Sequence, residues 1–150
     1  NLRCSHCYLD TNALTRQSAC ELSTQEGLRL IDQMAELNPN LLLILTGGEP
    51  LLRKDIYELA SYASKKGMMV VLGTNGNLID DDIAKKLKES GVAGIGISLD
   101  SIVPERHDKF RPRLQGKIFM KSLTLLNFPI TSALRSLICS FWCVREKDKN

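Results

Sequence analysis

Three short apolar runs at regular spacing constrain the fold of this chain more than any other feature. The runs cover 41–45, 68–72 and 94–99, and their ends lie about 25 to 28 residues apart. A short, continuously apolar run is typical of a strand in a parallel sheet that is covered on both faces. Units of this size predict parallel strands joined by right-handed helical crossovers, in a barrel or a doubly wound sheet.

A helix is predicted before each of these strands. The first begins at a capping box from Ser23 to Glu26, and apolar positions at helical spacing extend it over about 24–37. In each of the next two helices an aspartate can cap the start and a glycine can end the helix. These residues are Asp55 and Gly67 in one helix, and Asp80 and Gly91 in the other.

The length of the chain limits which of these folds it can complete. Its 150 residues are enough for one hydrophobic core but short of the roughly 250 residues of an eight-unit barrel. We therefore expect an α/β fold, a partial TIM-type (β/α) barrel with parallel strands, incomplete at both ends. The barrel core is expected to cover 1–127. Residues 128–150 have no clear helix or strand period, and we expect an irregular tail there.

Charge and hydropathy exclude several classes of partner. Lys and Arg total 20 against 17 for Asp and Glu, and the net charge of +3 is mixed along the chain, so no nucleic-acid partner is expected. No apolar run reaches the roughly 18 residues that suggest a membrane span, and no segment resembles a signal peptide. We expect a cytoplasmic protein with no membrane partner.

The cysteines are better suited to metal binding than to disulfides. There are five, an odd number spread unevenly over the chain. Cys4 and Cys7 are separated by two residues, a spacing that lets one loop hold one metal ion or two corners of an iron-sulfur cluster. Alone, this spacing also fits half of a zinc site or two free thiols. Cys20 is interpreted as a buried or incidental thiol, and we assign no role to the two cysteines beyond it.

Polar residues gather where the predicted strands end. The carboxyl ends of parallel strands meet at one edge of a sheet, where barrels and doubly wound sheets bind their ligands. A single site above the strands is therefore expected. The polar residues at these ends are Glu49, Thr74, Asn75, Ser98 and Asp100.

Each of these strand ends has a ligand-binding interpretation and a simpler one. Gly47 and Gly48 lack Cβ, so the backbone can approach a ligand there, and Glu49 offers an acceptor for an ammonium group. The alternative is a tight turn before Pro50. The hydroxyl, amide and carboxylate groups at the ends of the next two strands can bind ribose hydroxyls and a ligand carboxylate. The alternative is that these side chains serve as strand-end or helix caps.

Four motifs, in order along the chain, resemble those of one enzyme superfamily. Residues 1–8, Asn-Leu-Arg-Cys-Ser-His-Cys-Tyr, resemble the C-x-x-x-C-x-x-C motif of radical S-adenosylmethionine (SAM) enzymes from its second residue onward. Thr-Gly-Gly-Glu-Pro at 46–50, Thr-Asn-Gly at 74–76 and Ser-Leu-Asp at 98–100 are similar to motifs that follow later strands of that family. The resemblance covers about 1–113 and is strongest to the branch that modifies tetrapyrroles and peptides.

The resemblance implies a set of cofactors and a role for each candidate residue. Three cysteines of the family hold a four-iron four-sulfur cluster, and Cys4 and Cys7 match the second and third. The segment from Gly47 to Glu49 matches the part that contacts the methionine amino group of SAM. His6 takes the place of an aromatic residue near adenine, or is an exposed loop histidine. The cluster reductively cleaves SAM to a 5′-deoxyadenosyl radical, which abstracts hydrogen from the substrate.

The resemblance also implies binding partners and leaves alternative hypotheses open. A small-molecule tetrapyrrole or a peptide is the expected substrate, with an external electron donor such as ferredoxin or flavodoxin. The first cluster cysteine would precede Asn1, so we expect a truncated fragment that is inactive in isolation. The competing hypotheses are a non-catalytic metal-binding or interaction module and an inactive gene remnant. Residues 105–111 can shape a substrate entrance, although a solvated helix start after Pro104 is the preferred interpretation.

Overall fold

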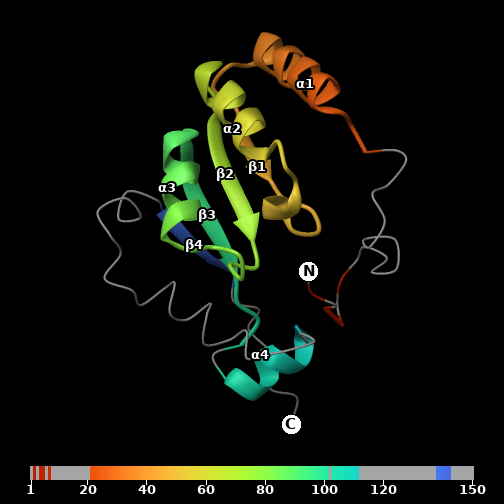
Figure 1. Cartoon of the computed structure of the whole chain (residues 1–150), viewed down its shortest axis with the longest axis vertical. Coiled ribbons are helices and arrows are strands. Elements are labelled where there is room, and N and C mark those ends of the chain that lie inside the picture. Colours follow the sequence, from red (N-terminus) through yellow and green to blue (C-terminus); the bar gives the residue numbers. More distant parts are fainter. Residues whose placement is uncertain are drawn as a thin grey trace.

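The fold is a four-stranded parallel sheet with helices between its strands (Figure 1). The computed structural model describes residues 2, 4, 5, 7, 21–101, 103–111 and 138–142. The strand order is the order along the chain, β1 (Leu42–Leu45), β2 (Met69–Thr74), β3 (Val92–Ser98) and β4 (Ile138–Trp142). The helices are α1 (Thr24–Leu37), α2 (Ile56–Lys65), α3 (Asp81–Glu89) and α4 (Pro104–Phe110), with a short 3-10 turn η2 (Pro50–Leu52).

Two helix starts were predicted correctly because their caps are local. At α1, the Ser23 hydroxyl accepts from the Glu26 amide at 3.3 Å, and the Glu26 carboxylate accepts from the Ser23 amide at 2.8 Å. At α3, the Asp80 carboxylate accepts from the Ile83 amide at 2.8 Å. Both arrangements satisfy amides of a first helical turn, which have no partner within the helix.

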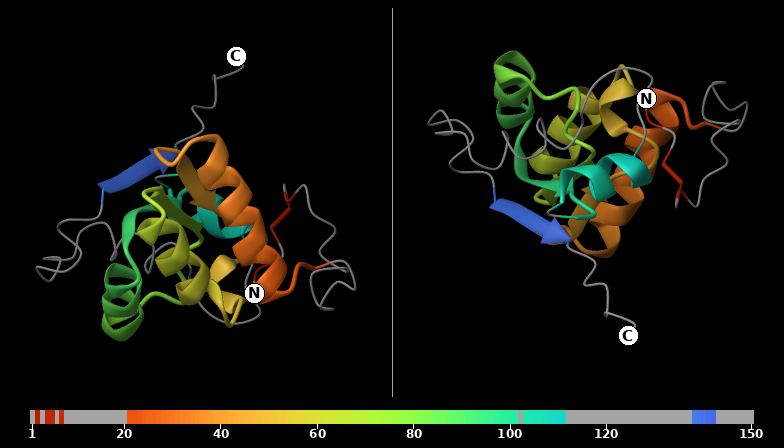
Figure 2. Two further views of the ribbon diagram at one scale, coloured as in Figure 1. Left: turned by 90° about the horizontal axis from the view of Figure 1, so that it is seen from above. Right: turned by 90° about the horizontal axis from the view of Figure 1, so that it is seen from below.

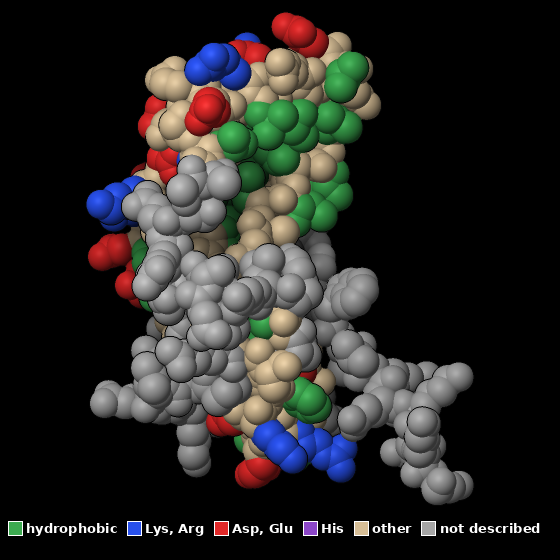
Figure 3. All heavy atoms as spheres, turned by 90° about the vertical axis from the view of Figure 1, so that its right-hand side faces the viewer, with side chains coloured by type: hydrophobic (Ala, Val, Ile, Leu, Met, Phe, Trp, Pro, Cys, Tyr) green, Lys and Arg blue, Asp and Glu red, His purple; other side chains and the backbone are tan. Residues whose placement is uncertain are grey.

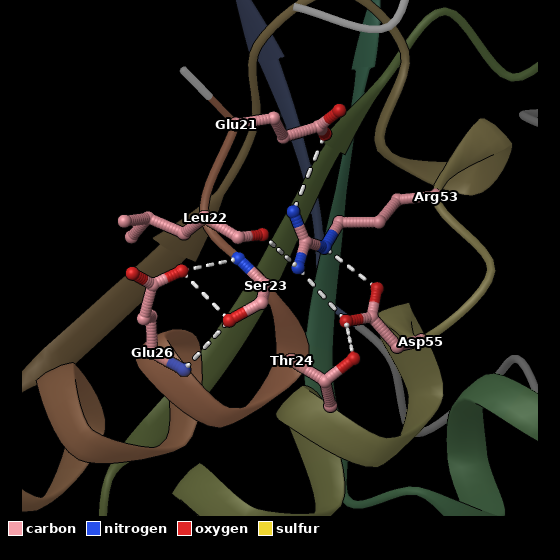
Figure 4. A network of polar contacts seen from close by, with 7 residues as sticks. All are labelled: Glu21, Leu22, Ser23, Thr24, Glu26, Arg53 and Asp55. Atoms are coloured by element: carbon pink, nitrogen blue, oxygen red, sulfur yellow. Dashed lines mark hydrogen bonds and ion pairs between the residues drawn. The ribbon is translucent and has the colours of Figure 1, made fainter. Parts of the chain in front are cut away.

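The predicted cap of α2 was wrong. Asp55 lies at the cap position, but its side chain makes no capping hydrogen bond. It pairs instead with the Arg53 guanidinium, with Nε–Oδ1 at 2.6 Å, and accepts from the Thr24 hydroxyl at 2.7 Å. Arg53 also donates to the Leu22 carbonyl oxygen and pairs with Glu21 (Figure 4). The carboxylate therefore joins the start of α2 to the start of α1, because Arg53, a neighbour in sequence, and Thr24 of α1 occupy it.

The core lies between the sheet and the first three helices. Viewed from above and below, α1, α2 and α3 lie along one face of the sheet (Figure 2). From β2, Val70 and Leu72 are fully buried in this layer, with Ala63 of α2 and Leu87 of α3. Burial of alternate strand residues is what a helix-covered face requires. Of the residues described, none forms a helix that is long and apolar enough to cross a membrane.

The opposite face and the β1 edge of the sheet are more open. Leu42 and Ile44 of β1 and Met69 of β2 are each more than half exposed. Figure 3 shows hydrophobic side chains gathered in the upper part of the face that looks to the right in Figure 1. Four parallel strands with exposed apolar residues fit part of a (β/α) barrel, so the predicted fold class is confirmed.

The expectation that 128–150 lacks regular structure was wrong in one segment. Strand β4, Ile138–Trp142, lies within it and pairs parallel to β3, with Gly94 opposite Ile138 and Ser98 opposite Trp142. The segment is rich in aromatic and β-branched residues, which favour strands, but it is too short to show an alternating pattern. Its place in the sheet comes from pairing with β3, a long-range contact that local periodicity does not reveal.

Candidate functional site

The cysteine loop and the carboxyl ends of the strands surround one hollow of about 270 Å³. In Figure 1 the arrowhead of β2 points toward the end of the molecule where α4 and the N-terminus lie. The predicted site residues that line the hollow come from four separate stretches of the chain. They are Cys4, Cys7, Gly47, Gly48, Glu49, Thr74, Asn75 and Ser98. The convergence expected from the order of the motifs is therefore present in the structure.

The cysteine loop is a tight turn docked on the end of α4. The Cys7 amide donates to the Cys4 carbonyl oxygen at 3.1 Å, which brings the two cysteines to one side of the turn. The Ser5 amide donates to the Phe110 carbonyl oxygen at 2.9 Å. Partial burial raises the pKa of the Cys4 thiol above its ordinary value, and the Arg111 guanidinium opposes this rise. These backbone contacts hold the cysteine loop against the end of α4.

The turn after β1 presents backbone to the hollow. Gly47 has φ +139°, a conformation that L side chains rarely adopt, and an added Cβ would meet no atom within 4 Å. The glycine is therefore required by the backbone conformation and not by crowding. In β2, an added Cβ on Gly73 would lie 3.1 Å from the Thr46 hydroxyl, so this turn also packs closely over the neighbouring strand.

Glu49 is buried and organises the ends of two strands. The residue is only 7% exposed. Its carboxylate oxygens accept hydrogen bonds from the Thr74 hydroxyl at 2.7 Å, the Asn75 amide at 3.0 Å and the Leu51 amide at 3.3 Å. An ionised carboxylate has about four lone-pair sites, so capacity remains for an ammonium donor from the hollow. Glu49 can serve both the turn and a ligand.

The end of β2 also forms its own turn, as the simpler interpretation predicted. The Thr74 hydroxyl accepts from the Gly76 amide at 3.0 Å, and the Asn75 side-chain oxygen accepts from the Asn77 amide at 2.9 Å. These bonds fix both side chains against the hollow. Preorganised polar groups of this kind bind a ligand without first having to become ordered.

Asp100 is held behind the wall of the hollow, and Ser98 lies in the wall itself. Both were expected to contribute to the single site above the strands. Instead, the Asp100 carboxylate binds the Arg111 guanidinium through both oxygens. It is Arg111 that lines the hollow. Asp100 therefore contacts the lining of the hollow through Arg111.

Arg111 is the functional candidate that the sequence did not single out. It stood within 105–111, which were interpreted as a solvated helix start or a substrate entrance. The structure contradicts solvation for His107, which is 0% exposed and accepts the Asp100 amide on Nδ1 at 3.2 Å. The sequence signal for these contacts is limited to an acidic residue at a strand end, Asp100, and the basic residues His107 and Arg111 shortly after it. His6, the predicted adenine neighbour, lies outside the described residues.

A second, larger hollow of about 400 Å³ lies on the other side of the turn after β1, against α1. Its walls are mainly apolar, with Leu30, Met34 and Ile44 among them, and the two cysteines of the loop are not part of its lining. Of these two hollows, only the smaller brings together thiols, glycine backbone and strand-end polar groups, so among the described residues it is the candidate functional site.

Comparison with known proteins decides the family. The sequence model of the radical SAM superfamily matches residues 1–127. This chain belongs to the radical SAM superfamily. The prediction from the four motifs is therefore confirmed, and so is the expected enzyme class, because the relatives that the chain matches are enzymes.

Two relatives and one solved structure show the extent of the similarity. The Fe-coproporphyrin III synthase of Methanosarcina barkeri (strain Fusaro / DSM 804) is 50% identical over 111 residues, 74% of this chain and 27% of that protein. The AdoMet-dependent heme synthase of the same organism is 42% identical over 112 residues, 74% of this chain and 31% of that protein. The structure "Native anSMEcpe with bound AdoMet and Cp18Cys peptide" is 26% identical with a TM-score of 0.63, covering 82% of this chain and 34% of that one.

This radical SAM chain thus spans between 27% and 34% of the length of these relatives. Radical SAM enzymes use a four-iron four-sulfur cluster and SAM, which confirms the predicted cofactors at the level of the family. The chemistry of the donor set fits the cluster, because Cys4 and Cys7 place two thiols on one hollow. Among the described residues no group of three or more His, Cys, Asp and Glu side chains is placed to hold a metal ion. A third ligand would have to come from elsewhere.

Proposed function

We propose that this chain is the part of a radical SAM enzyme that binds the cluster and SAM. Cys4 and Cys7 would each ligate one iron. The segment Gly47 to Glu49 would hold the amino group of SAM, with Thr74, Asn75 and Ser98 around its ribose and carboxylate and His6 near its adenine. Asp100 would act through Arg111. The core of this unit would extend to about residue 127.

One observation supports the proposal above all others: the two thiols and the three strand ends line the same hollow. A cluster and a nucleotide must meet within contact distance for an electron to pass between them. The cluster would supply a low-potential electron that cleaves SAM reductively to a 5′-deoxyadenosyl radical. The residues of this chain would bind and orient the two cofactors and shield them from water, which are the protein's means of adjusting cluster chemistry.

We propose a tetrapyrrole as the substrate from which hydrogen is abstracted. The support is the 50% identity to a protein described as an Fe-coproporphyrin III synthase. A peptide is the second candidate, because a structural relative at 26% identity was solved with a peptide bound. An external donor such as ferredoxin or flavodoxin would deliver the electron. We expect the enzyme in the cytoplasm.

The experiment is anaerobic reconstitution of the complete gene product with iron and sulfide, followed by reduction in the presence of SAM. We expect 5′-deoxyadenosine and methionine to form, and more 5′-deoxyadenosine when iron coproporphyrin III is the probe. Cys4→Ser and Cys7→Ser should each lose cluster iron and product, and the matched control Cys20→Ser should keep both. Product formation that is unchanged in Cys4→Ser and Cys7→Ser would overturn the proposal.

A peptide substrate would be indicated by a different outcome of the same experiment. In that case 5′-deoxyadenosine still forms, but iron coproporphyrin III neither increases its yield nor is altered. A non-catalytic metal-binding module predicts a third outcome, in which stoichiometric zinc binds and SAM is recovered intact. Each outcome separates one hypothesis from the others.

A further inference from the structure

Arg111 connects three parts of the site that are distant in sequence. Directly after α4, its guanidinium binds both oxygens of Asp100 at the end of β3, with Nη2–Oδ1 at 3.1 Å. Its remaining amino group, Nη1, lies 3.9 Å from the Sγ atom of Cys4. The side chains of Arg111 and Asp100 are only 13% and 17% exposed. This pair is therefore more shielded from water than an ordinary surface ion pair.

The contact with Asp100 fixes the direction in which the guanidinium points. A carboxylate and a guanidinium that share two parallel hydrogen bonds lie in one plane, so the third nitrogen has a defined position. Asp100 is itself fixed, because its amide donates to the buried side chain of His107 in α4. The nitrogen near Cys4 is thus held by a rigid support that runs from β3 to α4.

The cysteine loop is tied to the same place by its backbone. The amide and the hydroxyl of Ser5 both donate to the carbonyl oxygen of Phe110, at 2.9 Å and 3.4 Å. Phe110 and Arg111 are consecutive, so adjacent residues hold the backbone and the sulfur of the loop. Two contacts at one point restrict the loop more than either does alone.

We propose that Arg111 is a positioning residue for the cluster: it holds the Cys4 sulfur over the strand ends and places a positive charge beside it. This inference rests on the proposed function, because the cluster is the group that the sulfur would bind. A positive charge beside a cluster favours the reduced form, which carries one more electron. Without Arg111, the Asp100 carboxylate would also remain near the cluster as an uncompensated negative charge.

Two substitutions separate the charge from the geometry. Arg111→Gln removes the charge and the two-bond contact with Asp100. Arg111→Lys keeps the charge but loses the planar fork. The matched control is Lys109→Gln, which removes one positive charge from an exposed position on α4. All three variants are made in the complete gene product, and circular dichroism checks their folding.

The first readout is hydrogen exchange at the Ser5 amide in protein without a cluster. We expect several-fold faster exchange in Arg111→Gln and Arg111→Lys than in the wild type, and no change in Lys109→Gln. The second readout is the cluster potential, from a redox titration followed by electron paramagnetic resonance. Arg111→Gln should lower the midpoint potential of the cluster by about 59 mV. For one electron, this shift lowers the ratio of reduced to oxidised cluster at a given potential by about tenfold. Arg111→Lys should stay close to the wild type in this readout.

The proposal is overturned if Arg111→Gln matches Lys109→Gln in both readouts. If Arg111→Gln does not fold, Arg111→Lys carries the test, and wild-type exchange at Ser5 in that variant overturns the proposal. Failure of the proposed function gives another result, since the wild type itself would then form no cluster. Exchange at Ser5, measured without any cluster, still decides whether Arg111 holds the loop.

Discussion

The carboxylate of Glu49 accepts a hydrogen bond from the hydroxyl of Thr74 at 2.7 Å, in the interior of the protein. This contact joins the turn after β1 to the end of β2 across 25 residues of sequence. The same carboxylate also accepts from the Asn75 amide. The two strand ends that would bind SAM are thus parts of one hydrogen-bonded unit, and a change in either should affect both.

Glu49→Gln should destabilise the protein and weaken SAM binding. The amide group would present a donor where the carboxylate now has only acceptors, so a donor from Thr74 or Asn75 would lose its partner. An unsatisfied buried group costs about 1–3 kcal/mol. Urea unfolding measures the loss. Glu58→Gln, on the exposed side of α2, is the control and should change the unfolding free energy by less than about 0.5 kcal/mol.

Gly91→Ala should also be destabilising, for two reasons that act together. Gly91 has φ +79°, which costs a residue with a side chain about 1–3 kcal/mol, and its Cβ would lie 2.7 Å from Cβ of Ser64. Gly96→Ala is the matched control, because its Cβ would lie 3.9 Å from the nearest atom, the Leu72 carbonyl oxygen. Thermal unfolding should show a clear drop in midpoint for the first variant alone. Equal midpoints would contradict this account of the α3–β3 turn.

His107→Phe should remove the acceptor for the Asp100 amide without emptying the space. The partly buried amide would then lack this partner, at a cost of up to about 1–3 kcal/mol. His107→Gln keeps an acceptor in the same region and should recover part of the loss. Denaturant unfolding of the two variants tests this directly. Identical stability in Phe and Gln variants would show that the hydrogen bond to Asp100 is unimportant.

Asp55 should make the stability of the protein fall in acid. Burial raises the pKa of its carboxyl, but hydrogen bonds from Arg53 and Thr24 and the charge of Arg53 outweigh this, and the pKa is lowered in the folded state. In the unfolded chain it is about 3.9. The stabilising contribution is therefore present above about pH 4 and is lost as pH falls through the lower, folded value.

The measurement is the unfolding free energy between pH 7 and pH 3 for the wild type and Asp55→Asn. The variant should be less stable at pH 7 and show a shallower decline below pH 4. Asp82→Asn, which removes an exposed carboxylate at the start of α3, should decline as steeply as the wild type. If the unfolding free energy of Asp55→Asn fell with pH as steeply as that of the wild type, the role given to the network in Figure 4 would be refuted.

The sequence predicted the elements whose signals are local. The bounds of α1 were predicted as 24–37 because a capping box and helical periodicity lie within one segment. The strands of the first three units were found within two residues of their observed ends, since continuous apolar runs mark parallel strands. The expected cover on both faces was wrong for β1, where Leu42 and Ile44 are more than half exposed. The shared hollow was expected because motifs at the carboxyl ends of parallel strands meet at one edge.

Contacts between segments were the part that the sequence did not predict. Whether Asp55 caps its own helix or accepts from Thr24 depends on how α1 packs beside α2. The pairing of Asp100 with Arg111 depends on the return of α4 to the end of β3. Strand β4 is identified by its register with β3. In each case the deciding partner lies outside the local pattern, and only the folded chain brings it near.

The central claim is that the thiols of Cys4 and Cys7 and the ends of the strands form one site for a cluster and SAM. The most direct test is the electron paramagnetic resonance spectrum of the reduced, reconstituted gene product, recorded with and without SAM. The account predicts an iron-sulfur signal whose shape and g values change when SAM is added. A protein that binds only zinc, or a cluster signal that SAM leaves unchanged, would contradict it.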